Sequence, residues 1–307
     1  MMEGLASSTR KTYSSAQRKF LDFCQQLGNV DRGGSPCPTD EWTLCLFATY
    51  LANSLKHSSI KVYLSAVRSL HIELGFEDPL LNCPRLQRVV RGIKRCQGSS
   101  GSQRRPITKE VMHVIHGALN FHLLDHVMFW AACTLAYFGF LRSSEFTTPS
   151  LSAFSASLHL TVQDIALDSR VDPSCLRVTI KASKTDPFRK GCFVYIGKGS
   201  NPLCAITALN NYLRLRGDGP GPLFIMRDGS PLTRSALTVW IRDIIASAGL
   251  EGNFSSHSFR IGAATMAARM GIPDHIIKTL GRWSSAAYQI YIQSSPEKLS
   301  SFSKRLA

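Results

Sequence analysis

The stretch 127–146, VMFWAACTLAYFGFLRSSEF, decides the architecture of the C-terminal two thirds of this chain. It is apolar nearly all round, whereas a surface helix carries its apolar residues on one face. We therefore predict a central, buried helix that leads into Arg142 and Glu145. An arginine held rigidly one turn from a glutamate can offer a bidentate fork to phosphate oxygens. The alternative is a purely structural salt bridge between the two residues.

Segments whose pattern predicts β-strands follow this helix. Residues 157–167 alternate apolar and polar side chains, and residues 175–183 and 192–197 are rich in β-branched and aromatic residues. The turn-like segment KTDPFRKG, residues 184–191, separates the last two. We predict a small antiparallel sheet of three strands. Lys184 would lie at a hairpin tip, where it could reach a ligand or be an ordinary exposed lysine.

The rest of the chain has helical periodicity, so the fold class is mainly α with a small antiparallel β-sheet, α+β. The polar, Gly/Ser-rich segment around residues 96–110 is typical of a linker. We therefore predict a helical domain over 1–97, a linker over 98–106 and a second domain over 107–307. The expected further helices lie at 7–27, 39–54, 58–74, 84–96, 202–216, 231–248, 257–270, 273–280 and 284–292.

The charge of the chain points to a polyanionic partner. Lys and Arg number 36 against 21 Asp and Glu, for a net charge of +15 and a pI near 9.7. Nucleic acid is the first expectation and an anionic membrane the second. The helix at 84–96 carries an arginine stripe that could follow a phosphate backbone or be only a solvated face. The candidate DNA-binding residues here are Arg85, Arg88, Arg91 and Arg95, with Arg104 and Arg105 in the linker.

Other classes of protein are disfavoured. No window approaches the roughly 18 apolar residues of a membrane span, and the N-terminus lacks a secretory pattern. The nine cysteines are an odd number with no C-x-x-C pair, which argues against a disulfide framework and a zinc site. We expect an intracellular protein with reduced thiols.

Two further motifs could carry chemistry. In SSHSFRIGAATMAARMGI, residues 255–272, His257 and Arg260 stand on one face of the first turn of a helix, where backbone N–H groups favour an anion. In LGRWSSAAYQIYIQSS, residues 280–295, Tyr288 and Tyr291 share a helical face. The alternatives are a helix-capping histidine with a surface arginine, and aromatic packing in a core.

The order of these motifs resembles the tyrosine recombinase/integrase family over nearly the whole chain. The segments SKTDPFRKG and GRWSSAAYQIYI are most similar to segments in the recombinases of Crypton, DIRS and Ngaro elements. The resemblance implies a helical core-binding domain, a tyrosine-recombinase catalytic domain and a C-terminal tail helix. Where the commoner pattern has a second histidine, this chain has Arg282 followed by Trp283. We assign the role to Trp283 and expect Arg282 to bind DNA. The implied catalytic residues are Arg142, Lys184, His257, Arg260, Trp283 and Tyr291.

The resemblance implies a site-specific recombinase or transposase that needs no cofactor and no metal. Tyr291, favoured over Tyr288 by its spacing, would attack a phosphodiester and form a 3′-phosphotyrosyl link. Lys184 would protonate the leaving oxygen. The partners would be double-stranded DNA and further copies of the chain, a dimer to tetramer held by the tail over 294–307. The resemblance alone suggests a nuclear location.

Three other readings stay open. A domesticated descendant would bind DNA without cutting it. A type IB topoisomerase would use the same chemistry to relax supercoils without synapsis. A basic scaffold would match the motifs by accident, against which stands the ordered coincidence of six positions.

Overall fold

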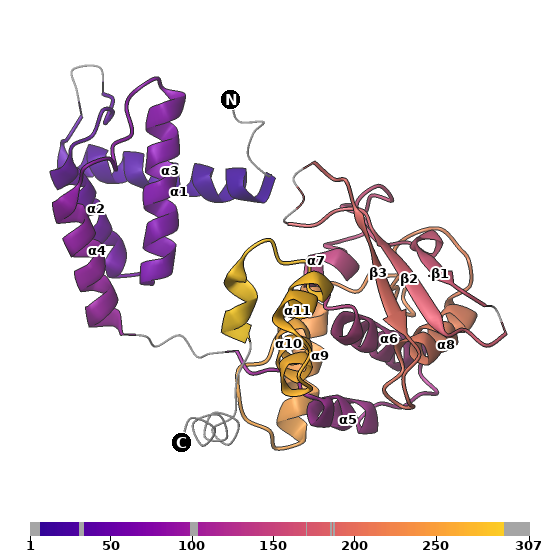
Figure 1. The fold of residues 1–307 in the computed structure, drawn as a ribbon. Coiled ribbons are helices and arrows are strands. Elements are labelled where there is room, and N and C mark those ends of the chain that lie inside the picture. The colour runs from indigo at the N-terminus through magenta and orange to yellow at the C-terminus, as the bar shows by residue number, and fades with distance from the viewer. Residues whose placement is uncertain are drawn as a thin grey trace, which may run out of the picture. The chain divides into compact units, whose positions relative to one another are not determined.

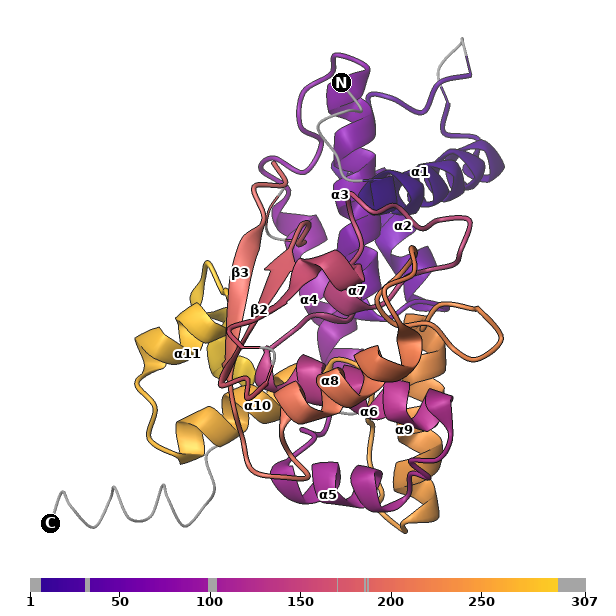
Figure 2. The same ribbon diagram turned by 90° about the vertical axis from the view of Figure 1, so that its right-hand side faces the viewer.

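The computed structural model describes residues 7–30, 34–98, 104–169, 171–184, 186 and 188–291, without the side chains of Ser7, Ser8, Ala287 and Tyr291. The chain forms two compact units, Met1–Gly101 and Ser102–Ala307 (Figures 1 and 2). Their boundary falls within the predicted linker. The described residues contain no helix that is both long and apolar enough to cross a membrane. All nine cysteines are free thiols.

The N-terminal unit is helical in its described part. Its helices are α1 (Ser7–Leu27), α2 (Glu41–Ala52), α3 (His57–Glu73) and α4 (Pro84–Gln97). Phe20 of α1 and Phe47 of α2 are fully buried and meet edge to face, with ring centroids 5.2 Å apart. Glu41 lies at the start of α2, and its Oε1 accepts hydrogen bonds from Arg85 N (2.7 Å) and Leu86 N (3.1 Å). This carboxylate therefore satisfies backbone donors that the first turn of α4 leaves unpaired.

The C-terminal unit is built around α6 (Leu124–Phe138), whose residues from Val127 to Tyr137 are all buried. This confirms the prediction of a central helix. Helices α8 (Ala205–Arg216) and α10 (Ser258–Arg269) pack on it. The other helical elements of the unit are α5 (Lys109–Gly117), α7 (Ser143–Phe146), η2 (Val162–Asp164), α9 (Arg234–Ser247), α11 (Asp274–Leu280) and η3 (Ala286–Tyr291).

The sheet of the C-terminal unit is antiparallel, with the order β1 (Ile165–Leu167), β2 (Cys175–Ile180), β3 (Cys192–Gly197). Val178 lies opposite Ile165 on one side and Val194 on the other. The sheet is thus confirmed as a small three-stranded sheet, and the fold as mainly helical.

The expected first strand over 157–167 is wrong in length, because only its last three residues pair. Asp164 Oδ2 accepts hydrogen bonds from Thr161 N (2.7 Å) and Thr161 Oγ1 (2.8 Å), which closes a 3₁₀ turn ahead of β1. Lys181 adds an ion pair to the same carboxylate at 2.6 Å. Leu160 and Val162 therefore pack in the core without forming a ladder. The expected α-helix over 284–292 is instead the 3₁₀ helix η3.

The end of the predicted linker already belongs to the C-terminal unit. The backbone of Arg104 forms an isolated β-bridge with Asn253, and Ile107 N donates to Ser258 O at 3.0 Å. Gly262 of α10 permits this approach, since a Cβ there would lie 1.8 Å from Ile107 O. The segment 104–107 is thereby held along the loop that leads into α10.

Candidate functional site

Glu145 is a buried carboxylate that organises the predicted arginine at the end of α6. Arg142 Nη1 lies 3.0 Å from Glu145 Oε1, and Arg142 N donates to Oε2 at 2.9 Å. Arg282 Nη2 lies 2.7 Å from the same Oε2. Burial raises the pKa of Glu145, but the charges of Arg282 and Arg142 and the Arg142 N–H outweigh it, so the net pKa is lowered. The salt-bridge alternative for Arg142 is therefore present in the structure.

Arg142 keeps part of its guanidinium for another partner. Within the described residues, the hydrogen bonds of its side chain use Nη1, which contacts Glu145 and Ser183 Oγ at 2.8 Å. Ser183 Oγ in turn donates to Glu145 Oε1 at 3.0 Å. This bonding ties the start of the β2–β3 hairpin to Arg142 and leaves the Nε and Nη2 donors for an external acceptor.

Arg260 is a fully buried charge, with 1% of its surface exposed. Its Nη1 donates to Phe140 O and its Nη2 to Gly281 O. The guanidinium carbon lies 4.1 Å from the centroid of the Trp283 ring, a cation–π contact. Gly281 makes room for this ring, since a Cβ there would lie 1.6 Å from it. The alternative of a surface arginine is therefore wrong, and Trp283 covers the buried guanidinium.

Arg282, predicted to bind DNA, is bonded inside the protein. Its backbone has a φ of 55°, in the left-handed region. Besides Glu145, its terminal nitrogens donate to Gly139 O (3.1 Å), Phe140 O (3.3 Å) and Leu280 O (3.3 Å). These bonds satisfy carbonyls that the ends of α6 and α11 leave open. A DNA contact of Arg282 stays a prediction, and its role in the structure is to join the end of α6 to the turn after α11.

His257 lies at the N-cap position of α10, half-buried, and its side chain does not cap the helix. Its pKa is lowered to about 4, first by burial and then by the positive charges of Arg104, Arg260, Arg142 and Arg234. The imidazole is therefore neutral at pH 7, and the positive charges of four arginines act on it. Such a concentration of fixed positive charge favours an anionic ligand.

Lys184 is exposed in the β2–β3 hairpin, whose residues 185 and 187 lie outside the described part of the chain. The backbones of Ser183 and Asp186 form an isolated antiparallel β-bridge in the hairpin. Asp186 Oδ2 also accepts from Gly191 N at 2.7 Å. Gly191 has a φ of 70°, and a Cβ there would lie 2.9 Å from Ile180 O, so the turn requires glycine. No described carboxylate pairs with Lys184, and its ammonium is open to a ligand.

The two tyrosines of η3 have different surroundings. Tyr288 is buried, its hydroxyl donates to Asp274 Oδ2 at 3.3 Å, and its ring centroid lies 5.8 Å from that of Trp283. Burial and the Asp274 carboxylate raise its pKa. Tyr291 is the last residue of η3, and its side chain lies outside the described atoms. Its nucleophilic role therefore stays a prediction.

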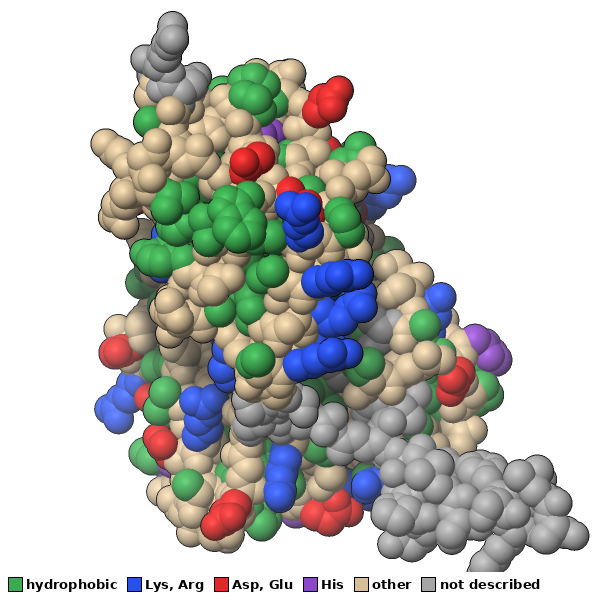
Figure 3. Space-filling model, turned by 90° about the vertical axis from the view of Figure 1, so that its left-hand side faces the viewer, with side chains coloured by type: hydrophobic (Ala, Val, Ile, Leu, Met, Phe, Trp, Pro, Cys, Tyr) green, Lys and Arg blue, Asp and Glu red, His purple; other side chains and the backbone are tan. Residues whose placement is uncertain are grey.

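The arginine stripe of α4 is exposed along its length. Leu86 on the other side of the helix is buried, and Val89, Val90 and Ile93 pack against the core. Among the described residues no carboxylate forms an ion pair with the stripe, and α4 itself contains no acidic residue. Figure 3 shows Lys and Arg side chains gathered in a row beside an apolar area. The stripe consists of Arg85, Arg88, Arg91 and Arg95.

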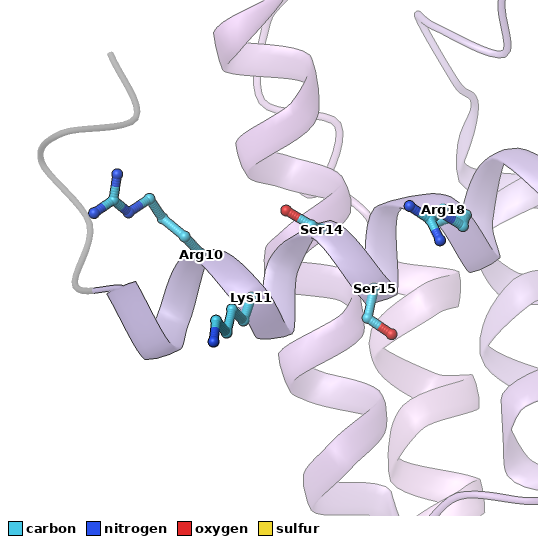
Figure 4. A pocket seen from close by; sticks show the side chains of 5 residues that line it. All are labelled: Arg10, Lys11, Ser14, Ser15 and Arg18. Carbon is cyan, nitrogen blue, oxygen red and sulfur yellow. The ribbon is translucent and has the colours of Figure 1, made fainter. Parts of the chain in front are cut away.

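Sequence reasoning missed a second basic face, on α1. Five of its side chains line an open depression of about 570 Å³ (Figure 4). The buried residues Ala16, Phe20 and Cys24 lie on the opposite side. The signal was present in the spacing, because positions three and four apart share a helical face. The residues of this α1 face are Arg10, Lys11, Ser14, Ser15 and Arg18.

Comparisons with known proteins identify the fold. Residues 155–298 match the Phage integrase family. Among solved structures, a XerH site-specific recombinase bound to palindromic difH substrate has a TM-score of 0.65 at 17% identity, covering 95% of this chain and 78% of that chain. A lambda integrase (75–356) dimer bound to a COC′ core site has a TM-score of 0.64 at 16% identity, with coverages of 95% and 91%.

A third similar structure is the Tn1549 transposon integrase in complex with transposon right end DNA. It has a TM-score of 0.64 at 14% identity and covers 98% of this chain and 94% of that chain. No sequence among curated proteins matches the chain. At these identities the structural similarity establishes the fold, which is that of the tyrosine recombinase catalytic domain.

Proposed function

We propose that this chain, which carries a domain of the tyrosine recombinase/integrase family on a matching fold, is a site-specific DNA recombinase or transposase. The observation that carries the proposal is the presence of two positioned arginines, Arg142 held by Glu145 and Ser183 and Arg260 buried beneath Trp283, whose positive charges act on a neutral His257. A phosphodiester gains charge on its non-bridging oxygens as the transition state forms, and preorganised donors lower that barrier. The resemblance to Crypton, DIRS and Ngaro recombinases, and with it a nuclear location, stays part of the proposal.

Arg142, His257 and Arg260 each have a role in this reaction. The Nε and Nη2 edge of Arg142 binds one phosphate oxygen, while Glu145 and Ser183 hold its other edge. His257 donates an N–H hydrogen bond to a phosphate oxygen, and the anion raises its pKa by charge attraction. Arg260 supplies positive charge from beneath Trp283, close to the same histidine.

The strand transfer needs a nucleophile and an acid. Tyr291 Oη forms a bond to phosphorus as the bond from phosphorus to the 5′-oxygen breaks. The phenolic proton passes to solvent water, and the 5′-oxygen takes a proton from Lys184 on the hairpin. A 5′-hydroxyl of a second strand reverses the step and releases Tyr291. The phosphotyrosyl ester keeps the energy of the broken bond, so no nucleotide hydrolysis is required.

A second candidate function is DNA binding without cleavage. It is favoured by the burial of Arg260, whose two terminal nitrogens donate to Phe140 O and Gly281 O. In that case the site would hold a phosphate through Arg142 and His257 alone. The two candidates differ in whether a covalent bond to DNA forms.

Covalent trapping separates them. Labelled duplexes with a nick beyond random candidate sites are incubated with the protein and denatured in detergent, and DNA–protein adducts are measured. We expect an adduct with the wild type and none with Tyr291→Phe, while the matched variant Tyr288→Phe retains it. An adduct that persists in Tyr291→Phe would show that the nucleophile is wrong.

Two other outcomes decide between the alternatives. Tight binding without any adduct would support the non-cleaving protein. An adduct formed by a monomer that relaxes supercoiled DNA would support topoisomerase chemistry. The docking of the tail, residues 294–307, on a neighbouring copy lies outside the described residues and stays a prediction, tested by assembly on DNA after its deletion.

A further inference from the structure

Arg234 is an exposed arginine that the proposed reaction does not use. It is the first residue of α9, directly after the N-cap residue Thr233, whose Oγ1 accepts from Ala236 N at 3.1 Å. This cap fixes where the helix begins and so fixes the backbone of Arg234. Among the described residues no carboxylate pairs with the guanidinium.

The start of α9 is bonded to the loop that carries His257. Thr238 Oγ1 donates to Arg234 O at 2.9 Å and accepts from Ser256 N at 3.4 Å. Ser256 directly precedes His257. A short chain of hydrogen bonds therefore sets the first turn of α9, and Arg234 with it, beside the histidine.

A second exposed arginine is held at the same loop through different backbone contacts. Arg104 forms an isolated β-bridge with Asn253, and Ile107 N donates to Ser258 O at 3.0 Å. The charges of both Arg104 and Arg234 contribute to the low pKa of His257, which is independent support for their closeness to it. The loop over 253–258 thus has one exposed arginine on each of the two segments that hold it.

The number of charges exceeds what one phosphate can balance. A phosphodiester carries one negative charge, while Arg104, Arg142, Arg234 and Arg260 carry four positive charges near His257. Glu145 does not remove this excess, because Arg282 already offsets it. Each strand of duplex DNA presents a further phosphate every 3.4 Å along the axis, so neighbouring phosphates are available for the remaining charges.

We propose that Arg234 and Arg104 bind the backbone phosphates next to the phosphodiester held at His257. The inference rests on the proposed function for the identity of the central phosphate. The half-buried Arg142 and the buried Arg260 serve that central group, and the two exposed arginines serve its neighbours. Phosphate contacts of this kind set the position of the duplex and carry no sequence information of their own.

The test uses the full chain with Tyr291→Phe, which separates binding from strand transfer. The affinity for a labelled duplex is measured by fluorescence anisotropy between about 50 and 200 mM salt, where each phosphate contact adds about 0.9 to the slope of log K against log salt. We expect Arg234→Gln to reduce the slope by about 1 and Arg234→Lys to restore it. Arg104→Gln gives a similar reduction.

The matched control is Arg227→Gln, an exposed arginine of the same unit whose position is set by a bond from its backbone N to Asp125 (2.6 Å). It leaves the slope unchanged. A slope for Arg234→Gln equal to that of Arg227→Gln overturns the inference. The thermal midpoint checks that Arg234→Gln folds like the parent.

The inference and the proposed function can fail separately. If the wild type forms no covalent adduct while Arg234→Gln still flattens the slope, the proposed function is wrong and the phosphate contact stands. If the adduct forms and the slope does not change, the inference alone is wrong. A parent protein with no affinity for duplex DNA overturns both.

Discussion

Two groups of arginines, one in each unit of this chain, have opposite surroundings. In the C-terminal unit, Arg260 and Arg282 are enclosed and donate to carbonyl oxygens at the end of α6 and to Glu145. In the N-terminal unit, the arginines of α4 extend into solvent without an acidic partner among the described residues. The same side chain is therefore part of the folded core in one unit and part of a surface field in the other.

The difference teaches how each group of arginines can act. A buried guanidinium must have its hydrogen bonds made, and its partners are left unsatisfied when it is removed. Its position is therefore rigid, as a transition-state contact requires. An exposed arginine is solvated and replaceable, and it contributes through the release of counterions from DNA. Substitutions at buried and exposed positions test this difference, and the largest effect is expected in the buried network.

The buried network should be most sensitive at its carboxylate. Glu145→Gln leaves Arg142 and Arg282 without a counter-charge in a buried place, and we expect a loss of about 3–5 kcal/mol in the free energy of unfolding of the C-terminal unit. Urea denaturation followed by tryptophan fluorescence reports mainly on this unit, which contains Trp130, Trp240 and Trp283.

The control for this prediction is Glu251→Gln, which removes an exposed carboxylate from the same unit. It should change the free energy of unfolding by less than about 0.5 kcal/mol, as is usual for surface sites. Equal effects of the two variants would mean that the buried carboxylate contributes no more than an exposed one.

His257 should make the stability of the protein depend on pH. Its pKa of about 4 in the folded state lies below the ordinary value of 6.5, so the unfolded chain binds more protons between these values. The contribution is present above pH 6.5 and is lost as the pH falls toward 4. We expect His257→Gln to lose less stability than the wild type between pH 7 and pH 5, measured by urea midpoints.

The comparison for this pH effect is His122→Gln, a substitution of an exposed histidine. This variant should follow the wild type over the same range. A His257→Gln curve parallel to that of the wild type would mean that the histidine is not held neutral by burial and by its arginine neighbours.

The exposed stripe should give the smallest effect. Arg88→Gln is expected to leave the free energy of unfolding within about 0.5 kcal/mol of the wild type and to reduce the salt slope of DNA binding by about 1. Arg68→Gln is the matched control, because Arg68 already pairs with Asp78 at 2.8 Å. If both variants have the same slope, the α4 stripe is a solvated face and not a DNA contact.

Much of the fold followed from local pattern. The period of the apolar residues predicted α1 to α4 and the buried α6, and the β-branched runs predicted β2 and β3. The first strand was predicted too long, because alternation does not show that Asp164 closes a turn on Thr161. The short helix α5 was missed. The α1 face was readable from spacing, since it needs only the positions along one helix.

The order of Arg142, Lys184, His257 and Arg260 and the arginine spacing along α4 can be read from the sequence alone, because both depend only on positions along the chain. Only the tertiary structure decided which arginines are buried and what they bond. Arg260 reaches Phe140, 120 positions earlier, and Arg282 reaches Gly139, 143 positions earlier. Burial and hydrogen-bond partners depend on such distant contacts, and these exist only after α6, α10 and the turn after α11 have packed together.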